Sequence, residues 1–215
     1  MRNDTLSNRD LCDDSAQTPH RRGFERLEMP EADVVLYRTC FTGLQSDAFF
    51  EELQRNASWN QEKIKLYGKL IDLPRLTAWY GDEGRSYTYS GITVTPIPWM
   101  LVLLEIKKEI EVLSGVIFNS VLLNLYRDER DSVSWHSDDE PELGRDPVIG
   151  SVSFGATRSF QFKHKQNRTL RQKIELPHGS FLLMRGPTQH CWLHQVPKET
   201  KVRGPRINLT FRVIK

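Results

Sequence analysis

The chain has 215 residues, of which 38% are hydrophobic, and its 30 Lys and Arg residues nearly balance its 28 Asp and Glu residues. This length allows a large core without disulfides, and the three cysteines lack the CxxC spacing of a zinc finger. No apolar run reaches the ~18 residues that a membrane span needs. We therefore expect a soluble intracellular monomer without a membrane partner, cytoplasmic in a bacterium and nuclear in a eukaryote.

The first part of the chain is predicted to be a mobile tail followed by a strand and a helix. Residues 1–30 are rich in Asn, Asp, Ser and Arg and contain few large apolar side chains, a composition typical of a tail. Residues 34–37 form a β-type run, and the apolar spacing between residues 44 and 53 predicts an amphipathic helix. We expect residues 31–215 to form a single domain.

A hairpin and a second helix are predicted next. Gly68 separates two β-type runs within residues 64–73, which indicates a hairpin with Tyr67 at or near its tip. Between Pro98 and Gly115, apolar side chains recur every three or four residues. This pattern predicts a helix that the proline opens and the glycine ends.

The C-terminal part of the chain is predicted to be almost entirely strand. Turn residues separate short β-type runs at residues 148–154, 158–163, 171–176, 180–184, 191–196 and 206–214. This spacing is typical of a β-sandwich or jelly roll. The predicted fold class is therefore mainly β (α+β).

Candidate metal ligands follow a further β-type run at residues 133–135. In an extended chain, residues i and i+2 point to the same side, so His136 and Asp138 would present an imidazole and a carboxylate to one point. These are two members of the 2-His-1-carboxylate set that binds non-haem Fe(II). A solvated loop with a surface histidine is the alternative. A second imidazole could come from His178, His190 or His194, and the residues alone leave that choice open.

The last predicted strand carries a set of polar side chains on one face. Arg206, Asn208 and Arg212 occupy alternating positions, and guanidinium groups bind a small dicarboxylate through paired hydrogen bonds. If this face pointed outward, the arginines would simply be solvated. Asn124 and Tyr126, also two residues apart, offer an amide and a phenol as further hydrogen-bond partners.

A series of motifs runs along the chain in the order PRLTAWYGDEG, YTYSG, NLYR, WHSDDEP, SFGATRSF, WLH and PRINLTFR. Together they resemble the AlkB family of Fe(II)- and 2-oxoglutarate-dependent nucleic-acid dealkylation dioxygenases, over almost all of residues 37–215. The resemblance implies a double-stranded β-helix, which is a jelly roll with helices packed outside. It also implies a nucleotide-recognition lid at about residues 60–95 and a catalytic core at about residues 120–215.

The resemblance assigns roles to individual residues. It implies Fe(II), 2-oxoglutarate and O2 as cofactors, with His194 as the second imidazole in an iron ligand set of His136, Asp138 and His194. It implies a 2-oxoglutarate site formed by Asn124, Tyr126, Arg206, Asn208 and Arg212. The family positions that contact the substrate base are matched here by Tyr67, Tyr87, Tyr89 and Asp139. Core packing is the alternative for Tyr87 and Tyr89, and a surface carboxylate is the alternative for Asp139.

The activity implied by the resemblance is oxidative repair of N-alkylated bases, of the 1-methyladenine and 3-methylcytosine type, in DNA, with RNA as a further candidate. Hydroxylation of the alkyl group releases an aldehyde, succinate and CO2. A dioxygenase of this fold acting on another modified RNA or on a protein is one alternative, and a non-catalytic nucleic-acid-binding jelly roll is another. Because Glu199 interrupts the lysines of residues 197–201, we expect single strands to be modestly preferred over duplexes.

Overall fold

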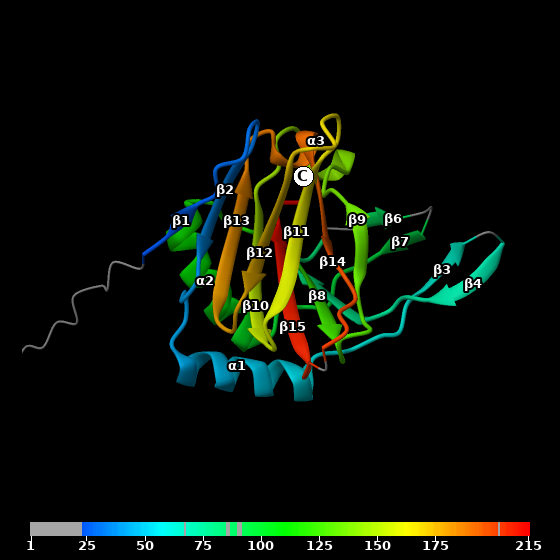
Figure 1. The fold of residues 1–215 in the computed structure, drawn as a ribbon. Helices are drawn as coiled ribbons and strands as arrows, with labels where there is room; N and C mark the ends of the chain where they lie inside the picture. The colour runs from blue at the N-terminus through cyan, green and yellow to red at the C-terminus, as the bar shows by residue number, and fades with distance from the viewer. Residues whose placement is uncertain (1–22, 67, 85–86, 90–91, 202) are drawn as a thin grey trace, which may run out of the picture.

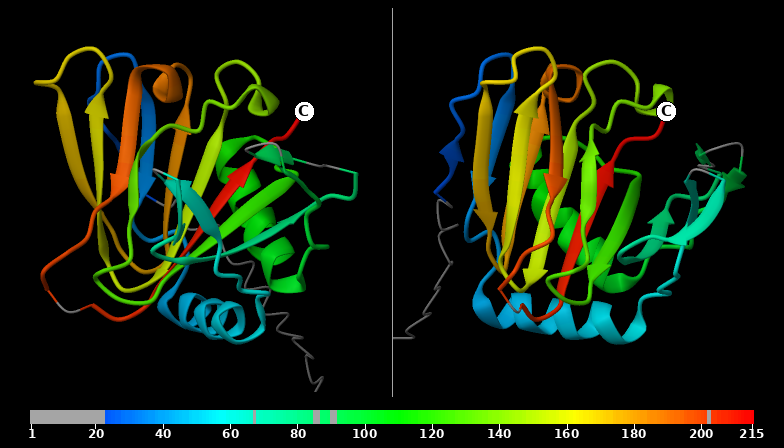
Figure 2. Two further views of the ribbon diagram at one scale, coloured as in Figure 1. Left: turned by 90° about the vertical axis from the view of Figure 1, so that its right-hand side faces the viewer. Right: turned by 45° about the vertical axis from the view of Figure 1, so that its right-hand side comes forward.

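Two antiparallel sheets lie face to face, with helices against the outer side of the larger sheet (Figures 1 and 2). The computed structural model describes residues 23–66, 68–84, 87–89, 92–201 and 203–215. The larger sheet has seven strands in the order β1-β2-β13-β10-β15-β8-β5, and the smaller sheet has four in the order β12-β11-β14-β9. This arrangement confirms the predicted jelly roll of the mainly β class.

The strands of the larger sheet are β1 (Glu25–Arg26), β2 (Asp33–Tyr37), β13 (Ser180–Arg185), β10 (Ile149–Gly155), β15 (Arg206–Arg212), β8 (Ser120–Tyr126) and β5 (Leu76–Gly81). Those of the smaller sheet are β12 (Arg171–Leu176), β11 (Arg158–His164), β14 (Trp192–Val196) and β9 (Val133–His136). The runs predicted from residue 148 onward are all present, with small shifts of their ends. The strand β14 begins at Trp192 because the preceding residues form a short helix, α3 (Thr188–Cys191).

Apolar side chains fill the space between the two sheets. Phe160 and Phe162 alternate with outward residues in β11, so both point into this core, where they meet Ile149 and Leu182 of the larger sheet. Trp192 of β14 is only 2% exposed and joins the same cluster. Burial of each such side chain stabilises the fold by about 1.5–3 kcal/mol.

The two longer helices form a second core with the outer face of the larger sheet. Thr42 caps α1 (Gly43–Asn56) in a capping box with Gln45, and Gly115 ends α2 (Leu101–Ser114) in a left-handed conformation with φ 70°. Their buried apolar side chains are Phe49, Leu53, Leu103, Ile106 and Ile110. Among the described residues, no helix combines the length and the apolar character needed to cross a membrane.

Two small hairpins lie beside β9, at one side of the jelly roll (Figures 1 and 2). One consists of β3 (Lys63–Leu66) and β4 (Lys69–Asp72), and the other of β6 (Tyr87–Tyr89) and β7 (Ile92–Val94). The hairpin predicted within residues 64–73 is therefore present, and Gly68 has the positive φ of 78° that its turn requires. Tyr67 itself lies outside the described residues.

The predicted extent of the N-terminal tail is wrong for residues 23–30. Glu25 and Arg26 pair with Leu36 and Val35 of β2, and Leu27 and Met29 are buried in the core between the sheets. Leu27 and Met29 are enough to hold this segment against the core. They are too few to change the polar average composition of residues 1–30, on which the prediction rested. Residues 1–22 lie outside the described part of the chain.

Candidate metal centre and cosubstrate site

Three potential metal ligands converge at one end of the space between the sheets. His136 ends β9 and pairs with His194 of the neighbouring strand β14, and Asp138 follows in the next loop. Ligand atoms of the three side chains lie within 4.8 Å of one another. The structure thus brings together the set expected from the sequence, whereas His178 and His190 lie elsewhere, beside Asp47 and Asp146 respectively.

The charges of these side chains suit a metal ion. Burial opposes ionisation of Asp138, but Arg212 and the two histidines outweigh it and lower the pKa of Asp138 to about 2. Burial is also the main reason why the pKa of His194 falls to about 3, so this imidazole is neutral at pH 7. Of the groups that lower the pKa of Asp138, the guanidinium of Arg212 has the largest effect.

Hydrogen bonds orient two of the ligands. His136 Nδ1 lies 2.8 Å from the main-chain oxygen of Ser134, which can only accept, so Nδ1 carries a proton and Nε2 is the ring nitrogen available to a metal. The main-chain N–H of Asp138 donates to Oε1 of the buried Gln189 at 3.0 Å. Two imidazoles and one carboxylate are the donor set that Fe(II) takes in non-haem oxygenases, so the residues present fit this ion.

A buried cation lies farther along the inner face of the larger sheet. Arg206 Nη2 donates to Ser153 Oγ and Asn208 Oδ1, each at 2.8 Å, but its Nε and Nη1 have no hydrogen-bond partner among the described residues. Burial lowers the pKa of Arg206 to about 10, so the side chain remains charged at pH 7. A buried charge with unsatisfied donors is costly, and a bound carboxylate would satisfy it.

Other polar residues surround this cation. The Tyr126 ring lies near two guanidinium groups, with its centroid 5.1 Å from Arg206 and 5.6 Å from Arg158. Asn124 accepts a 2.7 Å hydrogen bond from Arg75 Nε. The sequence alone did not indicate a role in this region for Arg75, Arg158 or Gln189, since their contacts join residues far apart in the chain.

The guanidinium of Arg158 connects two loops next to the site. It donates to the main-chain oxygens of Asp128, Asp131 and Pro197 at 2.8–3.0 Å, and the side chain is 1% exposed. Asp128 and Asp131 belong to the loop between β8 and β9, and Pro197 follows β14. One buried side chain therefore fixes the loops that flank the strands carrying both histidine ligands.

Of the residues predicted to contact a substrate base, Asp139 directly follows the expected metal ligand Asp138 in the loop after β9. Asp139 is partly exposed, and its Oδ2 lies 2.9 Å from Lys165 Nζ. Burial would raise the pKa of Asp139, but the bonds from Lys165 and Ser137 outweigh it and lower the pKa. Tyr87 and Tyr89 lie in β6, so the backbone places them in the hairpin region beside β9. Their roles stay predictions.

The expected effect of Glu199 on surface charge is wrong. Its side chain is 14% exposed and turned inward, where Oε1 accepts from the main-chain N–H of Ser159 at 3.0 Å and Oε2 accepts from Arg203 Nε at 2.9 Å. Arg158 Nε is a further 3.7 Å neighbour. Glu199 therefore neutralises buried and half-buried arginines instead of interrupting a row of solvated lysines.

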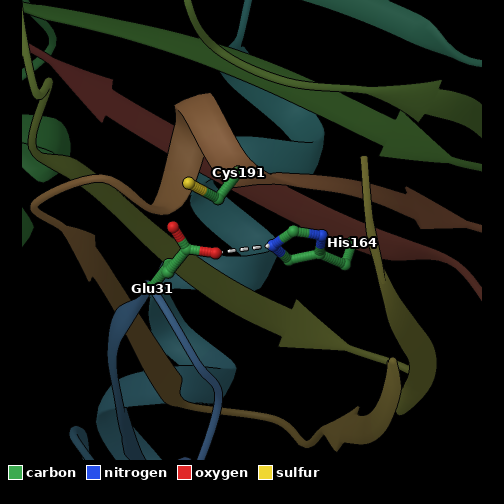
Figure 3. Close-up of side chains that lie close together, drawn as sticks. All are labelled: Glu31, His164 and Cys191. Atoms are coloured by element: carbon green, nitrogen blue, oxygen red, sulfur yellow. Dashed lines mark hydrogen bonds and ion pairs between the residues drawn. The ribbon is translucent and has the colours of Figure 1, made fainter. Parts of the chain in front are cut away.

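A second group with metal-binding side chains consists of Glu31, His164 and Cys191 (Figure 3). His164 Nδ1 accepts from the main-chain N–H groups of Gln166 and Asn167 at 3.2 and 3.0 Å, so its Nε2 must carry the ring proton. That proton is directed at Glu31 Oε2, which is 3.2 Å away. Because a protonated ring nitrogen has no lone pair for a metal, we interpret this group as a structural hydrogen bond.

Comparison with known proteins agrees with this geometry. Residues 33–212 match the family model of the 2OG-Fe(II) oxygenase superfamily. The solved structure of OsALKBH1 superposes with a TM-score of 0.60 at 19% identity, over 89% of this chain and 100% of that chain. At this low identity the superposition shows a shared fold.

Two groups of relatives are much more similar in sequence. The chain is 47% identical over 190 residues to the human alpha-ketoglutarate-dependent dioxygenase alkB homolog 3, which covers 84% of this chain and 66% of that protein. It is 40% identical over 188 residues to the mouse DNA oxidative demethylase ALKBH2, which covers 83% of this chain and 79% of that protein. The chain spans 62% and 66% of the length of the bovine and human alkB homolog 3 proteins. With the superfamily match over most of its length and these relatives beside it, the chain belongs to the AlkB family of 2OG-Fe(II) oxygenases.

Proposed function

We propose that this protein is an Fe(II)- and 2-oxoglutarate-dependent dioxygenase that removes alkyl groups from N-alkylated DNA bases of the 1-methyladenine and 3-methylcytosine type. The convergence of His136, Asp138 and His194 within 4.8 Å carries the proposal, because this ligand set leaves metal positions open. The names of its relatives, a DNA oxidative demethylase and an alpha-ketoglutarate-dependent dioxygenase, support the choice of reaction and substrate.

Residues on two sheets would hold the cofactors. His136, Asp138 and His194 would bind the iron, and the carboxylates of 2-oxoglutarate would be bound by Arg206 and Arg212 with Asn124, Tyr126 and Asn208. With 2-oxoglutarate and O2, bound Fe(II) supplies the oxidant that hydroxylates an alkyl carbon, and the products are aldehyde, repaired base, succinate and CO2. We assign this chemistry to one domain, with residues 120–215 as its core and residues 60–95 as its lid.

The target base would enter between this core and the two hairpins. A base within a duplex must first be flipped out of the stack, whereas a base in a single strand is already accessible. Tyr87 and Tyr89 would stack on the base, and Asp139 would accept a hydrogen bond from its exocyclic amine. In this structure Lys165 Nζ donates a hydrogen bond to Asp139 Oδ2. Binding of the base would replace this hydrogen bond.

We further propose that single-stranded DNA is modestly preferred over duplex DNA, that RNA is a second substrate and that the protein acts as an intracellular monomer. The cost of unpairing supports the strand preference. Glu199 no longer supports it, because its side chain is turned inward.

Substrate-dependent turnover is the test of this function. The protein is loaded anaerobically with Fe(II) and 2-oxoglutarate, mixed with O2 and offered methylated and unmethylated oligonucleotides in both strand states. We expect equal amounts of succinate and formaldehyde with the methylated strands and little with the unmethylated controls. Succinate release that ignores DNA methylation but follows a modified RNA or protein would favour a different substrate. If the wild-type protein bound no Fe(II), a non-catalytic jelly roll would be favoured.

Tyr67 gives a second test, which concerns strand preference. We expect Tyr67→Ala to lower kcat/KM on a methylated duplex more than on the same lesion in a single strand, because the ring would occupy the gap left by a flipped base. Leu70→Ala is the matched control, since Leu70 is 71% exposed on the same hairpin. An equal proportional loss on both strand states would rule out the wedge role.

A further inference from the structure

The outer face of the smaller sheet carries basic side chains beside an indole ring. Phe160 and Phe162 point into the core, so Lys163 points outward, and the register places Arg171 of β12 directly opposite it. Lys173 lies one step along the same face, opposite Gln161. We call Trp135, Lys163, Arg171 and Lys173 the basic sheet face.

Trp135 is the aromatic member of this face. It comes from β9, where it immediately precedes His136, and Lys163 Nζ lies 4.4 Å from the centre of its ring. A hollow of about 170 Å³ lies beside the indole and is lined by Trp135, Gln161, Phe162, Arg171, Gln172 and Lys173. A flat ring, a shallow hollow and cations therefore lie within one small area.

The charges of this face lack local compensation. Within the described part of the chain, Lys163, Arg171 and Lys173 form no ion pair with a carboxylate at 4.0 Å or less. Glu175 also points outward from β12, but it lies opposite Ser159, on the far side of Lys173 from Arg171. Along β11 and β12, the three cations of the face therefore have one carboxylate beside them, that of Glu175 at the end of the row.

The basic sheet face and the metal ligands are joined through β9, which carries both Trp135 and His136. The edge strand β9 carries His136 toward the inside of the jelly roll and Trp135 toward the outside, and the two hairpins lie next to this edge (Figures 1 and 2). A strand of nucleic acid that left the site around β9 would reach Trp135 first. From β9 to β12 it would then cross three strand spacings, or about 14 Å.

We propose that the basic sheet face binds the single-stranded nucleic acid that flanks the target base, with one flanking base stacked on Trp135 and phosphates on Lys163, Arg171 and Lys173. The inference rests on the proposed function for the identity of the ligand. Proteins that bind single strands combine a positively charged groove with aromatic rings on which bases stack. A duplex keeps its bases within the stack, so the indole gives it no comparable contact.

Lys163 has a defined part in this binding. Its ammonium now lies over the indole, and both residues are half-buried. Such a contact between a cation and a ring is weaker than the stacking of a base on the same ring. A flanking base would therefore replace the ammonium on the ring. The flexible lysine side chain would then contact the adjoining phosphate.

The test measures binding of unmodified oligonucleotides of 20 nucleotides, in single-stranded and duplex form, by fluorescence anisotropy at several salt concentrations. The charge variant is Lys163→Gln with Lys173→Gln. Its matched control is Arg55→Gln with Lys108→Gln, which removes two exposed charges from α1 and α2. We expect the charge variant to reduce the salt slope of single-strand binding by about 1.4, at ~0.7 for each lost phosphate contact, and the control to leave it unchanged.

The stacking contact has its own variants. We expect Trp135→Leu to weaken binding of the single strand about fivefold or more and to leave duplex binding unchanged. Trp135→Phe keeps an aromatic ring and should retain most of the affinity. An equal loss in the Leu and Phe variants, or an equal loss for both strand states, would exclude stacking on this residue and overturn the proposal.

Failure of this inference differs from failure of the proposed function. If the charge variant binds the single strand as tightly as its control does, with the same salt slope, the basic sheet face binds no nucleic acid and the inference is overturned, even if the wild type demethylates DNA. If the wild type releases no succinate with methylated strands but binding depends on Trp135 and Lys163, the proposed function fails and the surface assignment stands.

Discussion

Arg212 Nη2 lies 2.6 Å from Asp138 Oδ1, and this largely buried ion pair joins the end of β15 to the loop after β9. One member is an expected metal ligand, and the other is an expected ligand of 2-oxoglutarate. The two sites therefore share a charged contact. A change at Arg212 should alter cosubstrate binding and the environment of the metal together.

Arg212→Lys keeps the charge but loses the planar pair of donors. We expect a KM for 2-oxoglutarate raised about tenfold or more, with unchanged affinity for an oligonucleotide, because a single ammonium cannot bind Asp138 and a carboxylate in the same way. The measurement is a 2-oxoglutarate titration of succinate release. Arg185→Lys is the control, since Arg185 pairs with Asp33 at 3.0 Å. Weaker oligonucleotide binding with an unchanged KM would mean that Arg212 contacts phosphate.

Arg206→Met should separate stability from cosubstrate binding. In the free protein, Met removes a buried cation with two unsatisfied donors, so we expect thermal stability equal to or higher than that of the wild type. Added 2-oxoglutarate should raise the Tm of the metal-loaded wild type and leave that of the variant unchanged. Thermal unfolding with and without 2-oxoglutarate measures both effects. A variant that is still stabilised like the wild type would remove Arg206 from the cosubstrate site.

Glu199→Gln should destabilise the fold by about 1–3 kcal/mol at pH 7, because Ser159 and Arg203 lose a charged acceptor. Burial alone would raise the pKa of Glu199, but the hydrogen bonds from Ser159 and Arg203 and the charge of Arg158 outweigh it and lower this pKa in the folded state. A carboxylate whose pKa is lowered by folding stabilises the folded state at pH values above its ordinary pKa of about 4.3. This stabilisation is lost as the pH falls through the pKa of the folded state. The difference between wild type and variant should therefore shrink below about pH 4.

Denaturant unfolding at several pH values measures this difference. Glu175→Gln is the matched control, because Glu175 is exposed, and it should change stability by less than about 0.5 kcal/mol. A constant difference between Glu199→Gln and wild type from pH 7 to pH 3 would mean that the charge of Glu199 does not stabilise the fold.

Local patterns were enough to predict most of the regular elements. The alternation around Phe160 and Phe162 determines which face of β11 is buried, and Gly115 ends α2 as its position suggested. The short separation of His136 and Asp138 in the sequence likewise lets the end of β9 and the next loop bring both side chains to one point. Each of these features depends on neighbours in the sequence, so the sequence contains the whole signal.

Features that depend on distant contacts could not be predicted in the same way. The side chain of Glu199 is turned inward by its contacts with Arg158 and Ser159 of β11. The burial of Leu27 and Met29 follows from the pairing of the preceding Glu25 and Arg26 with β2. The partner of Arg75 is Asn124, on a strand that is remote in sequence. Such contacts become visible only when the sheets are assembled.

The most direct test of the central claim is an anaerobic calorimetric titration with Fe(II). We expect one equivalent to bind the wild type and the His190→Ala control, and we expect His136→Ala, Asp138→Ala and His194→Ala each to weaken binding by at least about 100-fold, since each removes one of three protein ligands. Circular dichroism confirms that each variant is folded. Undiminished Fe(II) affinity in His194→Ala together with loss in His190→Ala would contradict the assigned metal centre.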